Sequence, residues 1–162
     1  MASGQFDLSG KVALVTGGNG GIGRAIALGF ADHGASVAVL GRNEERNSLV
    51  VDELRAKGIR AMALQADLGD RGEAQPAVQR VERELAPHNI QVNAIAPGWT
   101  EAEMTRRMRE DSARYDWSIN RTPLGRWAQP EEMAGIAIFL ASAASNYVTG
   151  TTIVAEGGFG LS

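Results

Sequence analysis

The sequence contains no cysteine, which excludes disulfides and every metal site built on thiolates. Its two histidines, His33 and His88, are isolated in the sequence and fit no metal-ligand spacing, so we expect no metal site. The longest apolar stretch, 133–141, is well short of the roughly 18 residues that a membrane-spanning helix requires. No apolar run precedes the first basic residue, Lys11, so we expect no secretory signal, no membrane anchor and a cytoplasmic location.

An excess of positive charge is also absent. The formal net charge of −3 at pH 7 argues against a partner held by bulk electrostatic attraction, such as nucleic acid or an acidic membrane surface. A small anionic ligand needs only a local site, so the net charge does not exclude one. With 162 residues, 44% of them hydrophobic, the chain is long enough for a single domain with a buried core. We therefore expect one domain spanning residues 1–162.

Apolar, β-branched runs alternate with segments whose apolar residues recur at helical spacing. The first run, 11–16, ends in glycines, and Ile22, Ala25 and Ile26 then follow at helical spacing up to Gly34. Strands that alternate with helices across short connections predict right-handed βαβ crossovers and a parallel sheet. The expected strands are 11–16, 36–40, 60–65, 89–96 and 152–155, and the expected helices are 21–34, 44–57, 71–86, 101–114 and 129–143.

Glycines gather where the first expected strand turns into the first expected helix. Residues 16–23, TGGNGGIG, fit both G-x-G-x-x-G and T-G-x-x-x-G-x-G. Glycines at such a turn permit a tight bend, a close approach by a ligand and close packing of helix on strand. The backbone amides and the positive end of the helix can then hold a pyrophosphate. A glycine-rich turn without a ligand is the alternative, and the strand before and the helix after it favour the binding turn.

A P-loop nucleotide site is a competing interpretation, because 18–23 fits the G-x-x-x-x-G part of that motif. The next two residues do not fit it. Arg24 and Ala25 stand where a P-loop has the Lys and the Ser or Thr that hold the terminal phosphates and magnesium. The sequence therefore disfavours phosphoryl transfer.

The T-G-x-x-x-G-x-G turn after the first strand resembles that of the short-chain dehydrogenases/reductases. Later segments are similar to the same family and follow in the same order. They are DL at 67–68, NAIAPG at 93–98, TPLGR at 122–126, PEE at 130–132, FLAS at 139–142 and VTG at 148–150. The resemblance implies an α/β fold with a Rossmann-type, doubly wound parallel sheet. It also implies an oxidoreductase that transfers a hydride between a nicotinamide dinucleotide and a small alcohol or carbonyl substrate, and it allows a homo-oligomer.

The resemblance assigns cofactor contacts to individual residues. The implied contacts are Gly17, Asn19, Gly21, Ile22 and Gly23 for the pyrophosphate and adjacent ribose, Asp67 and Leu68 for adenine, and Pro97, Gly98 and Thr100 for nicotinamide. The chain departs from the family at Ala102, where a Thr commonly helps to hold the nicotinamide carboxamide.

The end of the second strand bears on the choice between NAD and NADP. An acidic residue there would accept hydrogen bonds from the ribose 2′-hydroxyl of NAD, but the chain has Leu40, Gly41 and Arg42. A guanidinium suits a 2′-phosphate, so we favour NADP over NAD, with Arg42 as the contact. The alternative is that Arg42 is an ordinary exposed residue at the start of a helix.

The residues that perform the chemistry of the resembled family are absent. In that family a Tyr acts as acid and base, with its pKa lowered by a Lys four residues on, and a Ser and an Asn assist it. The tyrosines of this chain, Tyr115 and Tyr147, are followed at that spacing by Ile119 and Thr151. We therefore assign no catalytic residue in the 162 positions.

The chain is also too short between its third and fourth expected strands. Asp67 and Asn89 are separated by 21 residues, where the family has two further strands and two further helices. At about 30 residues per βαβ unit, the deficit is roughly 60 residues or more. In the strand order 3-2-1-4-5-6 the missing fourth and fifth strands are central. We place the junction near 82–88. Either the segment is deleted and the halves close with a new strand pairing, or the protein is longer than this sequence.

We therefore expect an NAD(P)-dependent oxidoreductase of the short-chain type, acting on an alcohol or carbonyl, with a sugar acid or polyol as the suggested substrate. The alternative is a catalytically silent nucleotide-binding or interaction module, because the catalytic residues are absent from these positions. Binding of the cofactor without turnover would favour this alternative.

Overall fold

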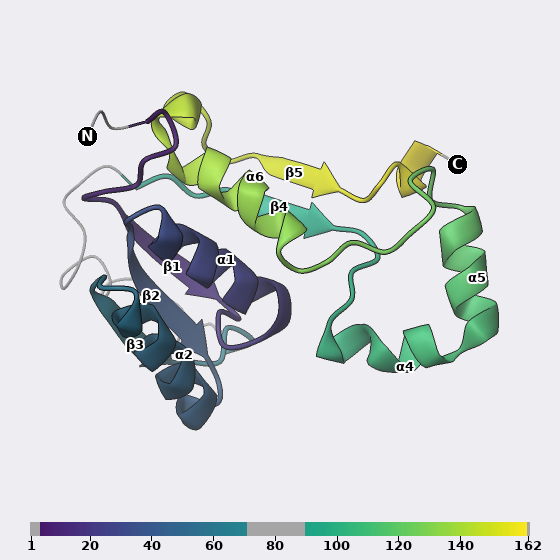
Figure 1. Ribbon diagram of the computed structural model, residues 1–162, viewed down its shortest axis with the longest axis horizontal. Coiled ribbons are helices and arrows are strands. Elements are labelled where there is room, and N and C mark those ends of the chain that lie inside the picture. The colour runs from purple at the N-terminus through teal and green to yellow at the C-terminus, as the bar shows by residue number, and fades with distance from the viewer. Residues whose placement is uncertain (1–3, 71–89, 162) are drawn as a thin grey trace.

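The structure of the chain, a computed structural model, describes residues 4–70 and 90–161. The expected helix at 71–86 and the whole of the expected junction at 82–88 lie outside the described residues. The described part consists of helices and parallel strands, as the alternating sequence pattern predicts (Figure 1). No helix in these two ranges is long and apolar enough to cross a membrane.

The N-terminal half alternates strands and helices at the expected places. Its elements are β1 (Val12–Thr16), α1 (Gly21–Asp32), β2 (Ser36–Gly41), α2 (Glu44–Ala56) and β3 (Ala61–Gln65). The three strands form one parallel sheet in the order β1-β2-β3, with Val12 opposite Ser36 and Val37 opposite Ala61. The core strand β2 is buried from Val37 to Gly41, which explains its continuous apolar sequence.

Local signals explain where the two helices end. Gly34 follows α1 with a φ of +88°, a left-handed conformation that glycine adopts without strain, and Gly58 does the same after α2 with a φ of +82°. The side chain of Asn43 caps α2 by accepting a hydrogen bond from the amide of Arg46. The spacing in α2 also predicts Leu49 on the buried face, and this is wrong, because Leu49 is 60% exposed.

The C-terminal half contains two strands and a series of short helices. Its elements are β4 (Ala94–Pro97), the 3-10 turn η1 (Glu103–Thr105), α4 (Arg106–Glu110), α5 (Ser112–Asn120), α6 (Glu132–Ala141), the turn η2 (Ala143–Ser145), β5 (Thr152–Ala155) and the turn η3 (Phe159–Leu161). The strands β4 and β5 are parallel, with Ala94 opposite Thr152. In Figure 1, α4 and α5 extend away from the sheet of the N-terminal half.

The expected single helix at 101–114 is wrong, because the segment is broken into η1, α4 and the start of α5. Two short polar side chains compete with the helical hydrogen bonds. The hydroxyl of Thr105 accepts from the amide of Ala102 and donates to the carbonyl of Thr100 at 2.6 Å. Asp111 has an extended backbone and accepts from the amide of Arg114, so it starts a new helix. The charge pattern alone does not reveal these breaks.

The expected strand 89–96 is shorter than predicted and begins at Ala94. Ahead of it, the side chain of Asn93 takes over the pairing by donating to the carbonyl of Val148 and accepting from the amide of Thr151. The expected helix 129–143 is also shortened to α6. The strand at 152–155 is confirmed with the expected boundaries.

The two halves meet through helices. Figure 1 shows α1 and α6 side by side, and a side-chain carbon added at Gly29 of α1 would lie 3.0 Å from the Cβ of Ala134 on α6. Phe30 and Ala27 on α1 share one buried cluster with Ala137 and Ile138 on α6. This cluster is the main core of the described residues, and it extends onto β2 and α2.

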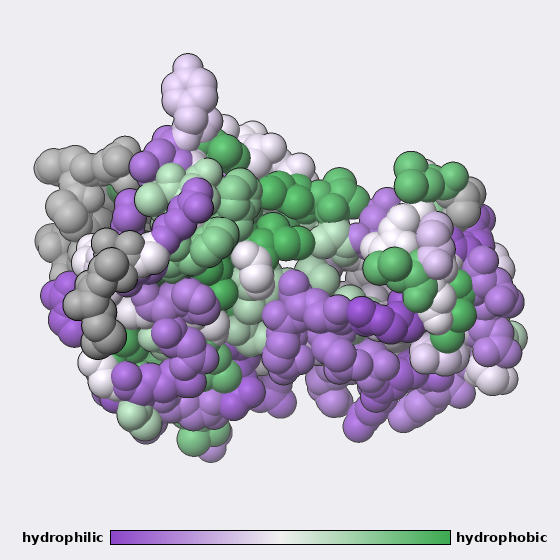
Figure 2. All heavy atoms as spheres, turned by 45° about the horizontal axis from the view of Figure 1, so that its top comes forward, coloured by the Kyte–Doolittle hydropathy of each residue, from purple (hydrophilic) through white to green (hydrophobic). Residues whose placement is uncertain are grey.

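In the described ranges β1 pairs with β2 alone and β4 pairs with β5 alone. In these ranges β1 and β4 do not pair with each other, so the halves do not close by a new pairing of these two strands. Within the described residues the fold is the Rossmann-type α/β arrangement without the two central strands. Figure 2 shows hydrophobic residues on the surface around β4 and β5, and Val154 on β5 is exposed.

Candidate functional site

The loop between β1 and α1 is folded tightly back on itself. Gly17 has a φ of +65° and donates from its amide to the carbonyl of Leu40 on the neighbouring strand at 2.8 Å. A side-chain carbon at Gly23 would lie 2.7 Å from the carbonyl carbon of Gly17 and 3.0 Å from the amide nitrogen of Gly18. A larger residue at Gly23 would displace the loop, and one at Gly17 would be strained by its positive φ. The turn therefore has the shape that the sequence predicts.

The N-terminus of α1 faces outward from this loop without a side-chain cap. Its N-cap is Gly20, which has no side chain that could accept from the first amides, and its first turn carries no acidic residue. Gly21 and Ile22 begin the helix, and Gly21 is exposed. Uncapped amides and the positive end of the helix dipole are suited to an anion such as a pyrophosphate.

The side chain of Asn19 turns from the loop toward the end of β2. Its Nδ2 donates to Oδ1 of Asn47 at 2.7 Å. Asn47 is fully buried on α2, and its own Nδ2 donates to the carbonyls of Gly41 at 2.8 Å and Leu64 at 3.0 Å. The analysis of the sequence missed Asn47. Its signal was a polar residue three and seven positions before the buried Val50 and Leu54, on the apolar face of a helix.

The expected adenine and ribose contacts follow the neighbouring strands. Arg42 is exposed just after β2, and its carbonyl accepts from Nε2 of Gln65 at 3.1 Å. Asp67 and Leu68 follow β3, and Leu68 is 45% exposed. The carboxylate of Asp67 accepts from the amide of Gly69 at 2.9 Å, so it also shapes its own turn. These residues lie beyond the carboxyl ends of adjacent parallel strands, the edge where such sheets bind ligands.

The expected nicotinamide contacts follow β4. Gly98 packs tightly against Glu156, because a side-chain carbon at Gly98 would lie 2.6 Å from the Cα of that residue. Thr100 is buried, and its hydroxyl donates to the carbonyl of Gly98 at 3.1 Å. A side-chain carbon at Gly21 would lie 3.4 Å from the Cβ of Ala102. The structure therefore brings the segment after Pro97 to the glycine loop.

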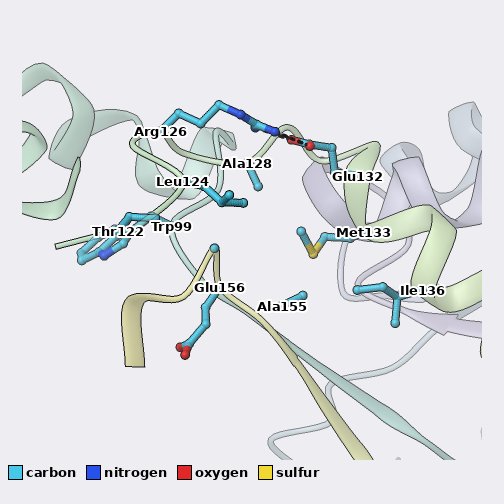
Figure 3. A pocket seen from close by; sticks show the side chains of 11 residues that line it. Trp99, Thr122, Leu124, Arg126, Ala128, Glu132, Met133, Ile136, Ala155 and Glu156 are labelled. Atoms are coloured by element: carbon cyan, nitrogen blue, oxygen red, sulfur yellow. Dashed lines mark hydrogen bonds and ion pairs between the residues drawn. The ribbon is translucent and has the colours of Figure 1, made fainter. Parts of the chain in front are cut away.

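A pocket lies beside this segment, between β5 and α6 (Figure 3). It is partly open to solvent at its mouth. Met133 and Ile136 project into it from α6, and Trp99 lines the opposite side. The remaining lining residues are Thr122, Leu124, Arg126, Ala128, Glu132, Ala155, Glu156 and Gly157.

Aromatic side chains pack behind the pocket. Trp99 stacks on the buried Trp127 with ring centroids 5.2 Å apart and meets Trp117 edge to face at 6.4 Å. Two methionines of the preceding helical segment lie outside this arrangement: Met104 is 92% exposed and Met108 is 38% exposed, and neither lines the pocket. Trp99 lines the pocket itself.

An ion pair closes one rim of the pocket. The guanidinium of Arg126 makes two hydrogen bonds of 2.7 Å to the carboxylate of Glu132, which also accepts from the amide of Gln129 at 2.7 Å. The hydrogen bonds from Arg126, followed by the bond from Gln129, lower the pKa of Glu132 to about 2. The same pairing raises the pKa of Arg126. The pair fixes the start of α6 against the preceding loop.

The described residues contain no tyrosine paired with a lysine. Tyr147 is fully exposed, and Tyr115 packs on the ring of Trp127 at a centroid distance of 5.3 Å. Lys57 forms an ion pair with Asp32 at 2.5 Å. Across 4–70 and 90–161, no group of three or more histidines and carboxylates is placed to hold a metal. No proton donor is assigned among the described residues of the site.

Comparisons with protein families match both halves of the chain. A model described as short chain dehydrogenase matches residues 11–85, and one described as Enoyl-(Acyl carrier protein) reductase matches residues 83–160. The first covers the glycine loop and β3, and the second covers the pocket, α6 and β5. The two matches meet in the segment where the sequence places its junction.

Individual relatives and solved structures agree. The 5-keto-D-gluconate 5-reductase of Escherichia coli K12 is 26% identical, with 94% of this chain and 96% of that protein covered. A 2-dehydro-3-deoxy-D-gluconate 5-dehydrogenase of Dickeya dadantii is 49% identical over 76 residues, which are 47% of this chain and 30% of that protein. The structure of a gluconate 5-dehydrogenase from Burkholderia cenocepacia in complex with NADP and tartrate is 26% identical, covers 100% of both chains and has a TM-score of 0.86. The chain belongs to the short-chain dehydrogenase/reductase family.

Proposed function

We propose that the protein is an NADP-dependent oxidoreductase that interconverts an alcohol and a ketone of a sugar acid. In this proposal the described chain supplies the cofactor site, and a central segment that this sequence lacks supplies the proton-transfer residues. The observation that carries the proposal is the glycine loop, whose outline and uncapped helix end fit a pyrophosphate.

The residues present fit a nicotinamide dinucleotide. The close approach of Gly23 to Gly17 leaves the main chain of the loop bare, so a pyrophosphate can reach the amides of Gly21 and Ile22. Asn19 would lie beside the adjacent ribose, Asp67 and Leu68 beside adenine, and Pro97, Gly98 and Thr100 beside nicotinamide. When bound, the cofactor supplies or accepts the hydride, while these residues bind and orient it.

NADP is favoured over NAD by the end of β2. No acidic side chain stands there, because Leu40 and Gly41 complete the strand and the exposed Arg42 follows. A guanidinium pairs with a phosphate group through charge-assisted hydrogen bonds. The NADP complex of the Burkholderia cenocepacia gluconate 5-dehydrogenase supports the same choice.

The substrate class is supported by the relatives. Gluconate, 5-keto-gluconate or a deoxygluconate derivative appears in the names of the similar enzymes from Escherichia coli, Dickeya dadantii and Burkholderia cenocepacia. These are dehydrogenases and reductases, so they give no support to a catalytically silent module. We expect the substrate to be a hydroxy or keto sugar acid.

The last part of the proposal concerns a central segment that this sequence lacks. The alignment with the Escherichia coli reductase runs over 245 positions against the 162 residues of this chain, so at least 83 positions have no counterpart here. The meeting of the two family models at 83–85 supports an insertion point near 82–88. We propose that the Tyr and Lys absent from this sequence belong to that segment.

Two measurements test the proposal. Calorimetric titration of the 162-residue chain with NADPH and NADH should give binding, tighter for NADPH. The protein isolated from its native cells should have an intact mass well above 17.1 kDa and should oxidise D-gluconate or a related sugar acid with NADP. A chain without affinity for either dinucleotide contradicts the cofactor site, and a native mass near 17.1 kDa contradicts the central segment.

A further inference from the structure

The side chain of Asn47 is buried without belonging to any expected site. It is 0% exposed, although it lies on α2 among the apolar residues that pack against the sheet. Burial of an unpaired amide would be unfavourable, and each of its polar atoms is in fact hydrogen-bonded. Its partners are the carbonyls of Gly41 and Leu64 and the side chain of Asn19. Asn47 therefore ties the ends of β2 and β3 to the glycine loop.

These partners fix the orientation of both amides. The carbonyls of Gly41 and Leu64 can only accept, so they must face Nδ2 of Asn47, and its Oδ1 must face Asn19. Oδ1 can only accept, so Asn19 must present its own NH2 group, at 2.7 Å. The donors and acceptors of this network are therefore fixed. If the O and N atoms of the Asn19 side-chain amide were exchanged, its hydrogen bond to Asn47 would be lost.

The position that Asn19 occupies is the one that a side chain on residue 41 would need. A side-chain carbon at Gly41 would collide with Nδ2 of Asn19 and would lie 2.7 Å from Oδ1 of Asn47. Gly41 has no positive φ, so these two amides, and not the backbone, exclude a side chain there. An acidic residue at the end of β2 would recognise the ribose 2′-hydroxyl of NAD. The network therefore places the NH2 group of Asn19, a hydrogen-bond donor, where the carboxylate of such an acidic residue would lie.

We propose that Asn47 is a positioning residue that holds the amide of Asn19 over Gly41 and thereby makes the site selective for a 2′-phosphorylated dinucleotide. One N–H of Asn19 is bonded to Asn47, and the other has no partner among residues 4–70 and 90–161. An amide held in this way donates to a phosphate oxygen and offers no acceptor to a 2′-hydroxyl at the same point. Arg42 supplies a positive charge nearby, and Asn47 fixes the orientation of the Asn19 amide. This inference rests on the proposed cofactor site.

The test compares the dissociation constants of NADPH and NADH for the full chain and its variants by titration calorimetry. Asn19→Ala removes the donor and leaves Oδ1 of Asn47 without its partner, so the melting temperature should fall, but by less than in Asn47→Ala, because the bonds of Asn47 to Gly41 and Leu64 remain. Its affinity for NADPH should fall about tenfold, because a hydrogen bond to a charged group is lost, while its affinity for NADH should change little. Asn47→Ala should change the ratio of the dissociation constants for NADPH and NADH by the same factor as Asn19→Ala. It should also lower the melting temperature.

The double variant Asn19→Ala/Asn47→Ala separates positioning from independent effects. If Asn47 acts through Asn19, the double variant should have the same NADPH to NADH ratio as either single variant, within about twofold. The control is Ser145→Ala, which removes a buried hydroxyl that donates to the carbonyl of Leu140 at 2.8 Å, far from the loop in sequence. It should lower the melting temperature and leave the ratio unchanged.

An unchanged ratio in Asn47→Ala, or multiplied effects in the double variant, overturns the role of Asn47 while leaving the cofactor site intact. If the unmodified chain binds neither dinucleotide, the proposed function fails and this inference fails with it. The two failures are therefore distinguished by the unmodified chain alone.

Discussion

Asn19 lies over Gly41, and its amide nitrogen occupies the space that a side chain on Gly41 would fill. Replacing Gly41 by Ala should therefore force Asn19 and Asn47 apart, although the backbone at residue 41 accepts an alanine. We expect a loss of about 1–3 kcal/mol in the free energy of unfolding, measured by urea denaturation. The matched control is Gly135→Ala on α6, where an added carbon has no neighbour within 4 Å and should stabilise the helix. Equal behaviour of the two variants would contradict the steric account.

The close packing at Gly23 predicts a loss of binding on its replacement. In Gly23→Ala the new methyl group would press on Gly17 and displace the main chain of the loop. Affinity for NADPH should fall by at least about tenfold in a calorimetric titration, because amides displaced from their positions no longer meet the pyrophosphate. The control is Gly20→Ala in the same loop, where an added carbon has no neighbour within 4 Å and φ is extended. Retained affinity in Gly23→Ala would show that the pyrophosphate binds elsewhere.

Arg42 should discriminate between the two dinucleotides. Arg42→Ala should weaken the binding of NADPH by about tenfold or more and change the binding of NADH little, because only NADPH carries the 2′-phosphate. Arg55→Ala serves as the control, because Arg55 is an exposed residue in the last turn of α2, the helix that follows Arg42. If Arg42→Ala leaves the ratio of the two dissociation constants unchanged, the preference for NADP does not come from this guanidinium.

The ion pair of Arg126 with Glu132 predicts a specific acid sensitivity. Because the pKa of Glu132 falls from 4.5 to about 2 in the folded chain, its contribution to stability is complete above about pH 4.5 and is lost as the pH falls toward 2. Glu132→Gln should therefore be less stable than the unmodified chain near neutral pH, and the difference should shrink below pH 4.5. Thermal melts across this range measure it. A stability difference between Glu132→Gln and the unmodified chain that stays constant across this pH range would contradict the role of the ion pair.

Local patterns in the sequence predict the N-terminal half well. The strands, α1, α2 and the glycine loop follow from apolar periodicity and from glycines at turns, and each depends on nearby residues. The helix expected at 101–114 fails for the opposite reason. Thr105 and Asp111 use their side chains to end and restart the backbone hydrogen bonds, and a charge pattern at helical spacing does not show this.

The candidate site also contains residues that the sequence predicts and residues that only the fold reveals. The glycine loop is predictable because its amides and bends come from one continuous segment. Asn47 is not, because its function depends on three partners from β2, β3 and the loop that only the fold brings together. Its polar side chain on an apolar helix face was the available signal. The placement of Thr100 also needs the fold, since its burial and its bond to Gly98 depend on packing behind β4.

The open sides of β1 and β4 in the described ranges have a consequence for the behaviour of the chain in solution. Each such side presents a row of main-chain donors and acceptors that attracts further strands. The contact of α1 with α6 already holds the two halves in place, so an incoming strand does not have to bring them together. We therefore expect these rows, as they stand in the described residues, to favour strand addition between copies of the chain in concentrated solution.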